Sequence, residues 1–445
     1  MKRLATSFLK DWLDSDDRKP LVLRGARQTG KTWLVRDLAA SSGKKLIELN
    51  FEKNPRLLSL FSSNDPQEIL MRLNTALRLN INPATCLLFL DEIQAAPEIF
   101  AKLRWFAEDL PQLPVVAAGS LLEFLLHDHE FSMPVGRINY VHLEQLSFEE
   151  FILARGDIQL YEFILKYAIN QEIPEEIHHQ LTVLFKEYTF IGGMPAAVAS
   201  WVKSRSLAKV SQIHQDLLAT YRDDFGKYGS RLPKERLEDV LIATPRLLGK
   251  KFVFNQVNSL VHPDSIKKAV TLLNRARVCH SVLSTAANGV PLAAEAREKF
   301  FKEIFIDTGL SCSSLGIGFD YLSEIEDICV INSGAIAEQV VGQILRTINP
   351  FYIEPALFYW YRDEKNSLAE LDYVIQYQNK VVPVEVKAGA CGRMRSLTLY
   401  MGLKSFKLAV RVCSAPLAIT QGEFTLLSIP FYLCGQLHRL LNDLR

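Results

Sequence analysis

The amino-acid sequence predicts an α/β protein in which a parallel-sheet domain with a phosphate-binding loop is followed by helices and by a second α/β domain. Three observations predict this class. The stretch "LVLRGARQTGKTWLVRDLAA" (residues 21–40) joins an apolar run to a glycine-containing loop and then to a helical pattern. Further short apolar runs alternate with helical segments up to about residue 142, as expected of a doubly wound parallel sheet. Near the C-terminal end, two successive strand patterns, 368–377 and 380–389, carry acidic residues.

The length and composition of the chain set limits on these domains. The chain has 445 residues, too many for one ordinary domain, and its 48% hydrophobic residues are enough for several cores. A net charge of +1 argues against a general polyanion binder but allows a local basic patch. The seven cysteines are scattered without a CxxC pair, which is typical of a reducing compartment rather than of a disulfide framework or a zinc site. An acidic N-terminal stretch and the lack of an apolar run of about 18 residues argue against a signal peptide and a membrane span, so we expect a cytoplasmic protein.

The loop that follows the first apolar run fits the phosphate-binding pattern G-x-x-x-x-G-K-[ST] in full. Its glycines let backbone N–H groups approach phosphates, its lysine would reach the β- and γ-phosphates, and its threonine hydroxyl would bind Mg²⁺. A chance match is the alternative, and the strand–loop–helix context argues against it. The expected nucleotide-binding residues are Gly25, Ala26, Arg27, Gln28, Thr29, Gly30, Lys31 and Thr32.

A phosphate-binding loop needs an acidic partner, and "CLLFLDEIQ" (86–94) supplies one at the end of a buried strand pattern. Asp91 at the strand tip can hold Mg²⁺ through water, together with Thr32. Glu92 beside it can orient and deprotonate the attacking water, so we expect it to be catalytic with Lys31. The alternative is a strand that merely ends in surface acids, and the preceding loop argues against it.

Two further polar residues follow later strands of the same domain. The strand pattern 114–120 ends in Gly119 and Ser120, and Ser120 would either contact the γ-phosphate or cap the next helix. Arg137 precedes the fifth strand pattern, where an arginine can face the nucleotide of a neighbouring subunit and stabilise charge in the transition state. The alternative for Arg137 is a surface arginine that pairs locally.

At these residues the chain resembles the prokaryotic AAA+ ATPases, related to the archaeal ATPase and signal-transduction ATPase groups, that carry a C-terminal domain of unknown function. The resemblance covers nearly the whole chain and rests on "GARQTGKTWL", "LLFLDEIQ", "AAGSLLEFLL", "GRINYVHLEQLSFEEF" and "FIGGMPAAV". It implies binding of ATP with Mg²⁺, hydrolysis, and assembly into a homo-oligomer. It supplies no biological role.

The middle of the chain has a helical period, which predicts a helical lid region. The period is broken at Pro174 and at "IGGMP" (191–195). The two glycines of the second break mark a sharp turn between helices. They could form a hinge, and a plain tight turn is the alternative that we favour.

Residues 226–305 predict a winged helix, because three helical patterns are followed by two strand patterns around a loop at Asn288 and Gly289. We expect the third helix to be capped by Asp264 or Ser265. The segment has fourteen lysines and arginines against seven aspartates and glutamates, an excess that suits contact with the phosphate backbone of DNA. The alternative is that the winged helix only packs the domains together.

The last segment carries a second set of candidate site residues. A helical pattern carries Glu338, and two successive strand patterns carry Asp372 and then Glu385 with Lys387. Residues two apart on a strand share a face, so Glu385 and Lys387 would point together, opposite Asp372 in a hairpin. Two carboxylates can hold a divalent metal with Glu338 as an outer ligand, and the lysine can steer or activate water.

This D…E-x-K arrangement resembles that of restriction-endonuclease-like nucleases. The usual pattern places a glutamate in the helix, an acid in the first strand and E-V-K in the second, and all three are present. The sequence departs from the pattern at Ala337, where a bulky aromatic residue is common, and at Ala388, where a serine is frequent. E-x-K is a short signal and many nuclease-like domains only dock partners, so cleavage and docking both stay open.

Taken together, these patterns predict an AAA+ P-loop domain (1–146), a helical lid (147–225), a winged helix (226–315) and a C-terminal restriction-endonuclease-like α/β domain (325–445). The main functional hypothesis is an ATPase that acts on, or is regulated by, nucleic acid, with DNA as the candidate partner. The alternative is a signalling switch in which ATP controls assembly and the C-terminal domain is an inactive docking module.

Overall fold

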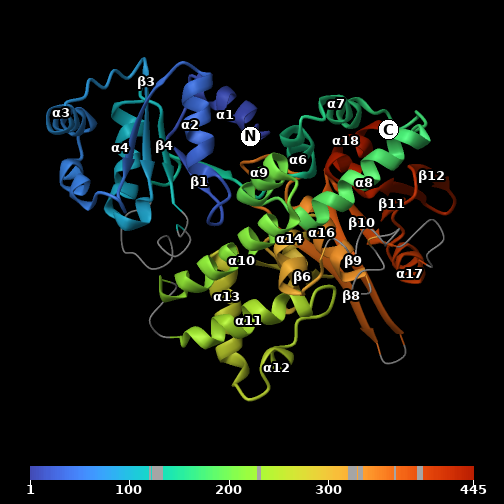
Figure 1. The fold of residues 1–445 in the computed structure, drawn as a ribbon. Helices are drawn as coiled ribbons and strands as arrows, with labels where there is room; N and C mark the ends of the chain where they lie inside the picture. Colours follow the sequence, from blue (N-terminus) through green and yellow to red (C-terminus); the bar gives the residue numbers. More distant parts are fainter. Residues whose placement is uncertain are drawn as a thin grey trace. The chain divides into compact units, whose positions relative to one another are not determined.

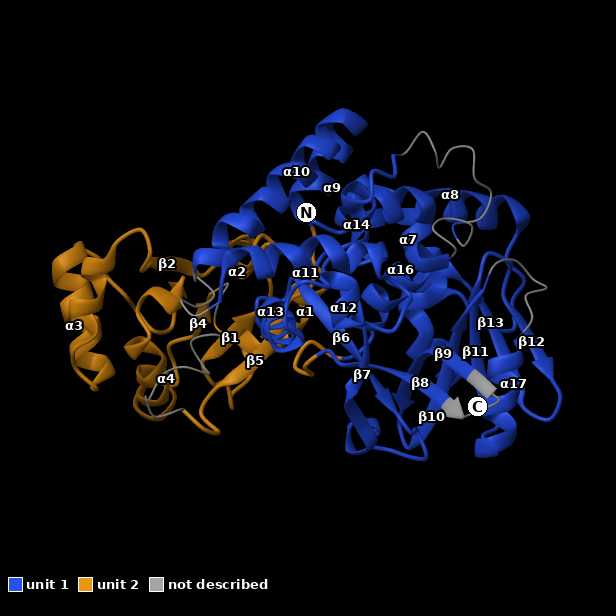
Figure 2. Ribbon diagram, turned by 90° about the horizontal axis from the view of Figure 1, so that it is seen from below, with its two compact units in different colours: residues 1, 145–349, 355–445 blue, residues 2–144, 350–354 orange. Residues whose placement is uncertain are grey.

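The computed structural model describes residues 1–119, 122, 134–227, 232–318, 328, 334–364, 367–387 and 394–444. The chain forms two compact units (Figure 2). The N-terminal unit contains residues 2–144 and 350–354, and the C-terminal unit contains residues 1, 145–349 and 355–445. One unit is built on a parallel sheet and the other on a mixed sheet, so the predicted α/β class is confirmed.

The N-terminal unit is a parallel sheet covered by helices on both faces (Figure 1). Its elements are α1 (Ala5–Asp14), β1 (Leu21–Arg24), α2 (Lys31–Ser41), β2 (Lys45–Asn50), η1 (Pro55–Phe61), α3 (Pro66–Leu77), β3 (Cys86–Asp91), η2 (Ile93–Ala95), α4 (Glu98–Asp109), β4 (Val115–Ala118) and β5 (Asn139–His142). The strand order is β2-β3-β4-β1-β5, and all neighbouring pairs are parallel. One apolar core packs α1 and α2 against the sheet, and a second packs α3 and α4 against it.

The buried strands explain where the candidate nucleotide site lies. All six residues of β3 are buried, as expected of a parallel strand that is covered on both faces. Because β1 and β3 run in the same direction, their carboxyl ends lie at the same edge of the sheet. The loop after β1 and the acidic end of β3 therefore meet there, as in other open α/β sheets.

A later part of the chain completes the N-terminal unit. Residues 350–354 lie beside β5, where the His142 N–H donates a hydrogen bond of 2.8 Å to the Phe351 carbonyl. The rings of Phe8 and Phe351 pack with centroids 6.0 Å apart. No pattern in the sequence predicts this contact, because five residues are too few to show a helix or strand period.

The helices of the C-terminal unit lie before, between and after its strands in the sequence. They are α6 (Phe148–Arg155), α7 (Ile158–Lys166), α8 (Glu175–Ile191), α9 (Pro195–Ser204), α10 (Leu207–Asp223), η3 (Asp224–Lys227), α11 (Lys234–Arg246), α12 (Phe254–Val257), α13 (Pro263–Arg275), η4 (Leu292–Glu295), α14 (Thr308–Ser314), α16 (Ala335–Leu345), α17 (Arg395–Lys404), η6 (Phe431–Gln436) and α18 (Leu437–Asp443). In the part of the chain that the structure describes, no helix combines the length and apolarity needed to cross a membrane.

The sheet of the C-terminal unit has eight strands in the order β12-β13-β11-β10-β9-β8-β6-β7. Its strands are β6 (Cys279–Thr285), β7 (Ala296–Phe305), β8 (Leu357–Glu364), β9 (Ser367–Tyr377), β10 (Lys380–Val386), β11 (Leu408–Cys413), β12 (Ala418–Gln421) and β13 (Thr425–Pro430). The hairpin β9–β10 is antiparallel, as the sequence predicts, whereas β10–β11 and β11–β13 are parallel.

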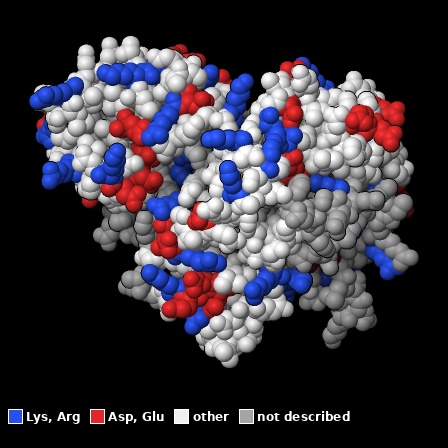
Figure 3. Space-filling model, viewed as in Figure 1, with Lys and Arg blue, Asp and Glu red and all other residues white. Residues whose placement is uncertain are grey.

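The hairpin that the sequence analysis assigned to a wing belongs to this larger sheet. β6 pairs with β7 in the antiparallel sense and with β8 in the parallel sense. Three helices, α11, α12 and α13, precede the hairpin as expected, and the winged helix stays a prediction. On the face shown in Figure 3, basic side chains are interspersed with acidic ones.

The expected cap of α13 is wrong. The N-cap is His262, whose Nδ1 accepts a hydrogen bond of 3.3 Å from the Asp264 backbone N–H. Pro263 occupies the first position of the helix. Proline suits that position because its fixed φ matches the helix and its missing N–H would have no partner there, so the helix begins earlier than the polar residues indicate.

The turn between α8 and α9 is tightly packed. Gly192 has a φ of +71°, and a side chain there would collide with the carboxylate of Asp307. A side chain at Gly193 would collide with the Leu146 carbonyl. The close approach of neighbouring groups thus explains both glycines, in agreement with the tight-turn interpretation.

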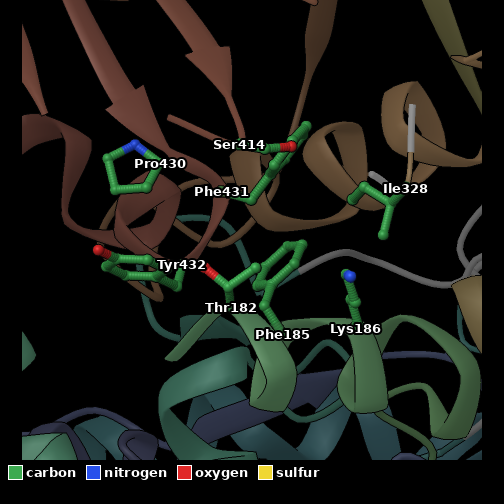
Figure 4. A pocket seen from close by; sticks show the side chains of 8 residues that line it. All are labelled: Thr182, Phe185, Lys186, Ile328, Ser414, Pro430, Phe431 and Tyr432. Carbon is green, nitrogen blue, oxygen red and sulfur yellow. The ribbon is translucent and has the colours of Figure 1, made fainter. Parts of the chain in front are cut away.

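A small apolar hollow lies between α8 and the end of β13 (Figure 4). The rings of Phe185 and Phe431 stack there with centroids 5.7 Å apart. The Tyr432 hydroxyl shares a hydrogen bond of 2.8 Å with His178 Nδ1. The hollow shares no residue with the candidate sites described below, and its rings hold α8 against the sheet.

Candidate nucleotide site and acidic cluster

The loop after β1 has the backbone of a phosphate-binding loop. Gly30 (φ +94°) and Gln28 (φ +62°) are both left-handed, and Gly30 is the N-cap of α2. The buried Thr29 hydroxyl donates a hydrogen bond of 3.0 Å to the Ala26 carbonyl, which closes the loop on itself. The N–H groups at the start of α2 and the helix dipole favour an anion at this position.

The lysine of the motif and an arginine from the N-terminus hold the loop from within. Lys31 Nζ donates to the carbonyls of Gly25 and Ala26 at 2.9 and 2.7 Å. The guanidinium of Arg3 donates to the carbonyls of Thr29 and Glu144, both at 2.8 Å. The loop carbonyls are therefore engaged by cationic donors.

The acid at the tip of β3 lies beside the threonine of the motif. Thr32 Oγ1 donates to Asp91 Oδ2 at 3.2 Å, and the Asn50 amide donates to the same oxygen at 3.3 Å. Burial raises the pKa of Asp91, and the neighbouring Glu92 carboxylate raises it further. A hydroxyl and a carboxylate that are placed together in this way fit Mg²⁺, which prefers oxygen ligands.

Glu92 is held in an uncommon backbone conformation next to that acid. Its φ is +53°, in the left-handed region that costs a non-glycine residue free energy and often occurs at functional sites. Gln94 Nε2 donates to the Glu92 carboxylate. Gln94 also lies against Gly119 at the end of β4, where a side chain would collide with the Gln94 amide oxygen. Gln94 thus fixes the direction of Glu92.

The other two residues predicted for this site are placed differently. Arg137 Nε donates to Glu108 Oε1 at 2.7 Å, and its side chain is 49% exposed. Within the N-terminal unit, Arg137 therefore pairs locally, which was the alternative left open. Ser120 lies outside the described residues, so its role stays a prediction.

Sequence reasoning missed three residues of this site. Arg3 and Asn50 contact residues far along the chain, and no local pattern marks them. Gln94 lies inside the "LLFLDEIQ" motif, so its place two residues after the catalytic candidate was a usable signal. All three act by positioning the loop or the acids.

A second group of charged residues gathers in the C-terminal unit around a β-bulge. The pairing of β8 with β9 shifts between residues 358 and 360, so that Tyr359 opposes both Asp372 and Tyr373. The Tyr373 hydroxyl donates a hydrogen bond of 2.8 Å to the Glu338 carbonyl. Bulges of this kind redirect side chains and are frequent beside functional sites.

The structure brings the three predicted hairpin residues together. Lys387 Nζ lies 2.8 Å from Glu385 Oε1. The Val386 backbone N–H donates to Asp372 Oδ2 at 2.7 Å. The side chains predicted to share one face of β10 therefore meet opposite Asp372, at the bulge.

A lysine that the sequence analysis did not single out completes the group. Lys302 of β7 lies 3.2 Å from Glu338 Oε2 and forms a second ion pair with Glu370. Its Nζ lies 5.4 Å from the ring centroid of Tyr359. We call Glu338, Glu370, Asp372 and Glu385, with Lys302 and Lys387, the acidic cluster.

The pKa values in the acidic cluster reflect burial and crowding of carboxylates. Burial raises the pKa of Glu338 to about 8 and that of Glu385 to about 7, and Asp372 contributes to both shifts. Burial opposes the charge of Lys302, but Glu338, Asp372 and Glu370 hold its pKa well above the ordinary value. Carboxylates that lie close together favour protons or cations.

The predicted second metal set is not assembled as a metal centre in the described residues. Among them, no group of three or more His, Cys, Asp or Glu side chains is arranged to hold an ion. Glu338 instead has the ammonium of Lys302 as its partner. The metal role of Glu338, Asp372 and Glu385 stays a prediction.

The fold and the loop define the N-terminal unit as a P-loop nucleotide-binding domain, and the comparison with family models specifies its class. Residues 17–152 match the model described as an AAA domain. This part of the chain is therefore similar to AAA ATPase domains. Residues 182–321 and 333–432 match two models described as domains of unknown function, DUF8612 and DUF4143.

Similarity to solved structures extends over most of the chain. The chain is similar to the Walker-type ATPase PABY2304 of Pyrococcus abyssi, at 14% identity and a TM-score of 0.43, over 70% of this chain and 94% of that one. No curated protein matches the chain.

Proposed function

We propose that the chain is a Mg²⁺-dependent ATPase. The hydrogen bond of 3.2 Å between Thr32 Oγ1 and Asp91 Oδ2 supports this most directly. These are the hydroxyl and the carboxylate that hold Mg²⁺ in P-loop ATPases. Both stand beside the N-terminus of α2, where backbone N–H groups and the helix dipole attract phosphate.

Each residue of the site has a separate task. Lys31 exchanges its hydrogen bonds to the Gly25 and Ala26 carbonyls for phosphate oxygens when ATP binds. Bound Mg²⁺ supplies charge neutralisation at the phosphates. Glu92, directed by Gln94, orients the attacking water and accepts its proton.

The test of this proposal is the Glu92→Gln variant. The amide keeps the size of the side chain but cannot accept the proton, so ATP should still bind while turnover falls about 100-fold or more. Glu98→Gln is the matched control, because it makes the same change at an exposed position six residues later. Lys31→Ala should lose ATP binding itself. Full turnover in Glu92→Gln would assign the base to another residue.

We also propose that the ATPase assembles into a homo-oligomer in which Arg137 acts on the nucleotide of a neighbouring subunit. Its half-exposed side chain is held by Glu108, which is also paired with Arg104. Glu108 thus keeps a cationic partner if Arg137 leaves. An arginine supplied in trans stabilises the charge of the transferring phosphoryl group.

A second candidate function is a metal-dependent, nuclease-like site in the acidic cluster, acting on DNA. The observation that favours it is the meeting of Asp372, Glu385 and Lys387 at the bulge. In this proposal the carboxylates hold the metal, and Lys387 acts on the water or the phosphate. The basic excess of residues 226–305, in the proposed winged helix, would bind the DNA backbone.

Two measurements decide between this candidate and a signalling switch with an inactive docking module. A DNA titration at several salt concentrations should show a steep loss of binding if phosphates are contacted. In a Lys31→Ala background, DNA should be cut only with Mg²⁺ or Mn²⁺, and Lys387→Ala should stop cutting without stopping metal binding. DNA binding without salt dependence, with no cleavage, would favour the docking module.

A further inference from the structure

We propose that the ammonium of Lys302 takes the place of a bound cation in the acidic cluster. It prevents a divalent metal from binding tightly there until it is withdrawn. This inference rests on the proposed cation site of the C-terminal unit and names its regulation. It predicts that removing Lys302 strengthens the binding of a divalent metal to the cluster.

The burial and contacts of Lys302 support this role. Its side chain is only 4% exposed, and its Nζ lies 3.2 Å from Glu338 Oε2 while pairing also with Glu370. A buried ammonium is stable only when its donors are paired with acceptors. The two carboxylates come from α16 and β9, which are separate elements, so one cation joins them in the way that a bound ion would.

One carboxylate oxygen of the cluster can still accept a hydrogen bond or bind a cation. Glu385 is 3% exposed, and its Oε1 pairs with Lys387 at 2.8 Å. Among the residues that the structure describes, none forms a hydrogen bond with its buried Oε2. A buried carboxylate oxygen without a partner is costly, and a cation is the ligand that would satisfy it.

The balance of charge points to a cation as well. The cluster holds four carboxylates against two lysines, so its ionised form carries a negative excess even with Lys302 in place. Taking Lys302 away leaves four carboxylates with Lys387 alone. Such a group of oxygen ligands suits Mn²⁺ or Mg²⁺, and a unit positive charge at this distance would otherwise repel the ion.

The neighbours of the cluster fix Lys302 in position. Lys302 is in β7, where it pairs with Val282 of β6. Gly249 lies so close to Glu338 that a Cβ atom at this position would be 3.1 Å from Glu338 Oε1. β7, which precedes α16 in the sequence, thus supplies the ammonium, and the segment at Gly249 covers Glu338. A movement of β7 would therefore withdraw the ammonium and open the site.

The experiment measures Mn²⁺ binding to the nucleotide-free full-length chain by electron paramagnetic resonance. Lys302→Met keeps most of the length of the side chain without its charge, and the variant should bind one Mn²⁺ about tenfold or more tighter than the unchanged protein. Adding Glu385→Gln should remove that ion, which assigns it to the cluster. Lys166→Met is the matched control, because it breaks an exposed lysine–glutamate pair of 2.8 Å with Glu162 and should create no site.

The possible outcomes separate this inference from the proposal beneath it. Equal Mn²⁺ binding with and without Lys302, lost in Glu385→Gln, would overturn the role of Lys302 and leave the cation site standing. A folded Lys302→Met protein that binds no Mn²⁺ would overturn both. If that variant does not fold, Lys302→Met with Glu370→Gln relieves one unpaired carboxylate, and the same binding results decide the question.

Discussion

Replacing Asp307 with alanine should strongly destabilise the C-terminal unit. The Asp307 carboxylate is fully buried and accepts hydrogen bonds from the Gly193 N–H (2.7 Å), the Leu310 N–H (3.1 Å) and the Gln343 amide (3.3 Å). The Leu310 bond is the N-cap bond of α14. Alanine would leave the N–H groups of Gly193 and Leu310 without this acceptor, whereas the Gln343 amide would keep its hydrogen bond to the Tyr188 hydroxyl. Each buried N–H without an acceptor costs about 1–3 kcal/mol.

The expected loss is smaller than the sum of these costs. Burial raises the pKa of Asp307, and the hydrogen bond from the Gly193 N–H opposes that shift only in part, so burying the native carboxylate itself costs some free energy. Removing one partner of a buried charged interaction typically costs about 3–5 kcal/mol. We expect Asp307→Ala to lower the free energy of unfolding by about this amount. Asp307→Asn keeps one acceptor oxygen and should lose less.

Calorimetry tests this expectation. Mg²⁺ with ATP should raise the melting temperature of the transition that belongs to the N-terminal unit, because a ligand stabilises the state that binds it. Asp307→Ala should lower the other transition. Asp216→Ala is the control, since it removes an exposed aspartate of α10. If both variants shift that transition equally, the buried network does not stabilise the turn between α8 and α9.

Three further predictions concern other parts of the chain. Burial raises the pKa of Glu303 from 4.5 to about 8, so its contribution to the free energy of unfolding is present below about pH 4.5 and is lost as the pH rises to about 8. Glu303→Gln should flatten the stability profile between these pH values, and a profile with unchanged slope would contradict this. Gly25→Ala would place a side chain against the Leu143 carbonyl, and ATP turnover should fall about 100-fold because the loop is displaced; normal turnover would show that the loop adapts. Turnover per subunit should rise with protein concentration and lose that rise in Arg137→Ala, with ATP affinity kept; a constant rate in a monomeric protein would exclude action in trans.

The parts of the structure that the sequence predicted are those determined by short motifs and by the periodicity of neighbouring residues. The phosphate-binding loop is one continuous motif, and the acid at the end of β3 follows a run of apolar residues. The hairpin that aligns Asp372 with Glu385 follows from the period of two and a short turn. In each case the neighbours along the chain determine the geometry.

The parts that escaped prediction depend on contacts between distant segments. Arg3 reaches the loop carbonyl of Thr29, and residues 350–354 join the edge of a sheet formed by the first 142 residues. The pairing of β6 with β8 converts an expected wing into part of a larger sheet. No periodicity encodes such pairings, because register between strands far apart in sequence is set by packing.

The two acidic sites show why an acid motif alone does not establish metal binding. At the tip of β3, the hydrogen bonds to Asp91 come from a hydroxyl, an amide and a backbone N–H, which orient the carboxylate without neutralising it. In the acidic cluster, Lys302 and Lys387 already neutralise part of the charge. Affinity for a cation depends on the negative charge that the protein leaves uncompensated. By this criterion we expect Asp91 to accept Mg²⁺ directly, and we expect the cluster to bind a divalent metal tightly only when the ammonium from β7 is withdrawn.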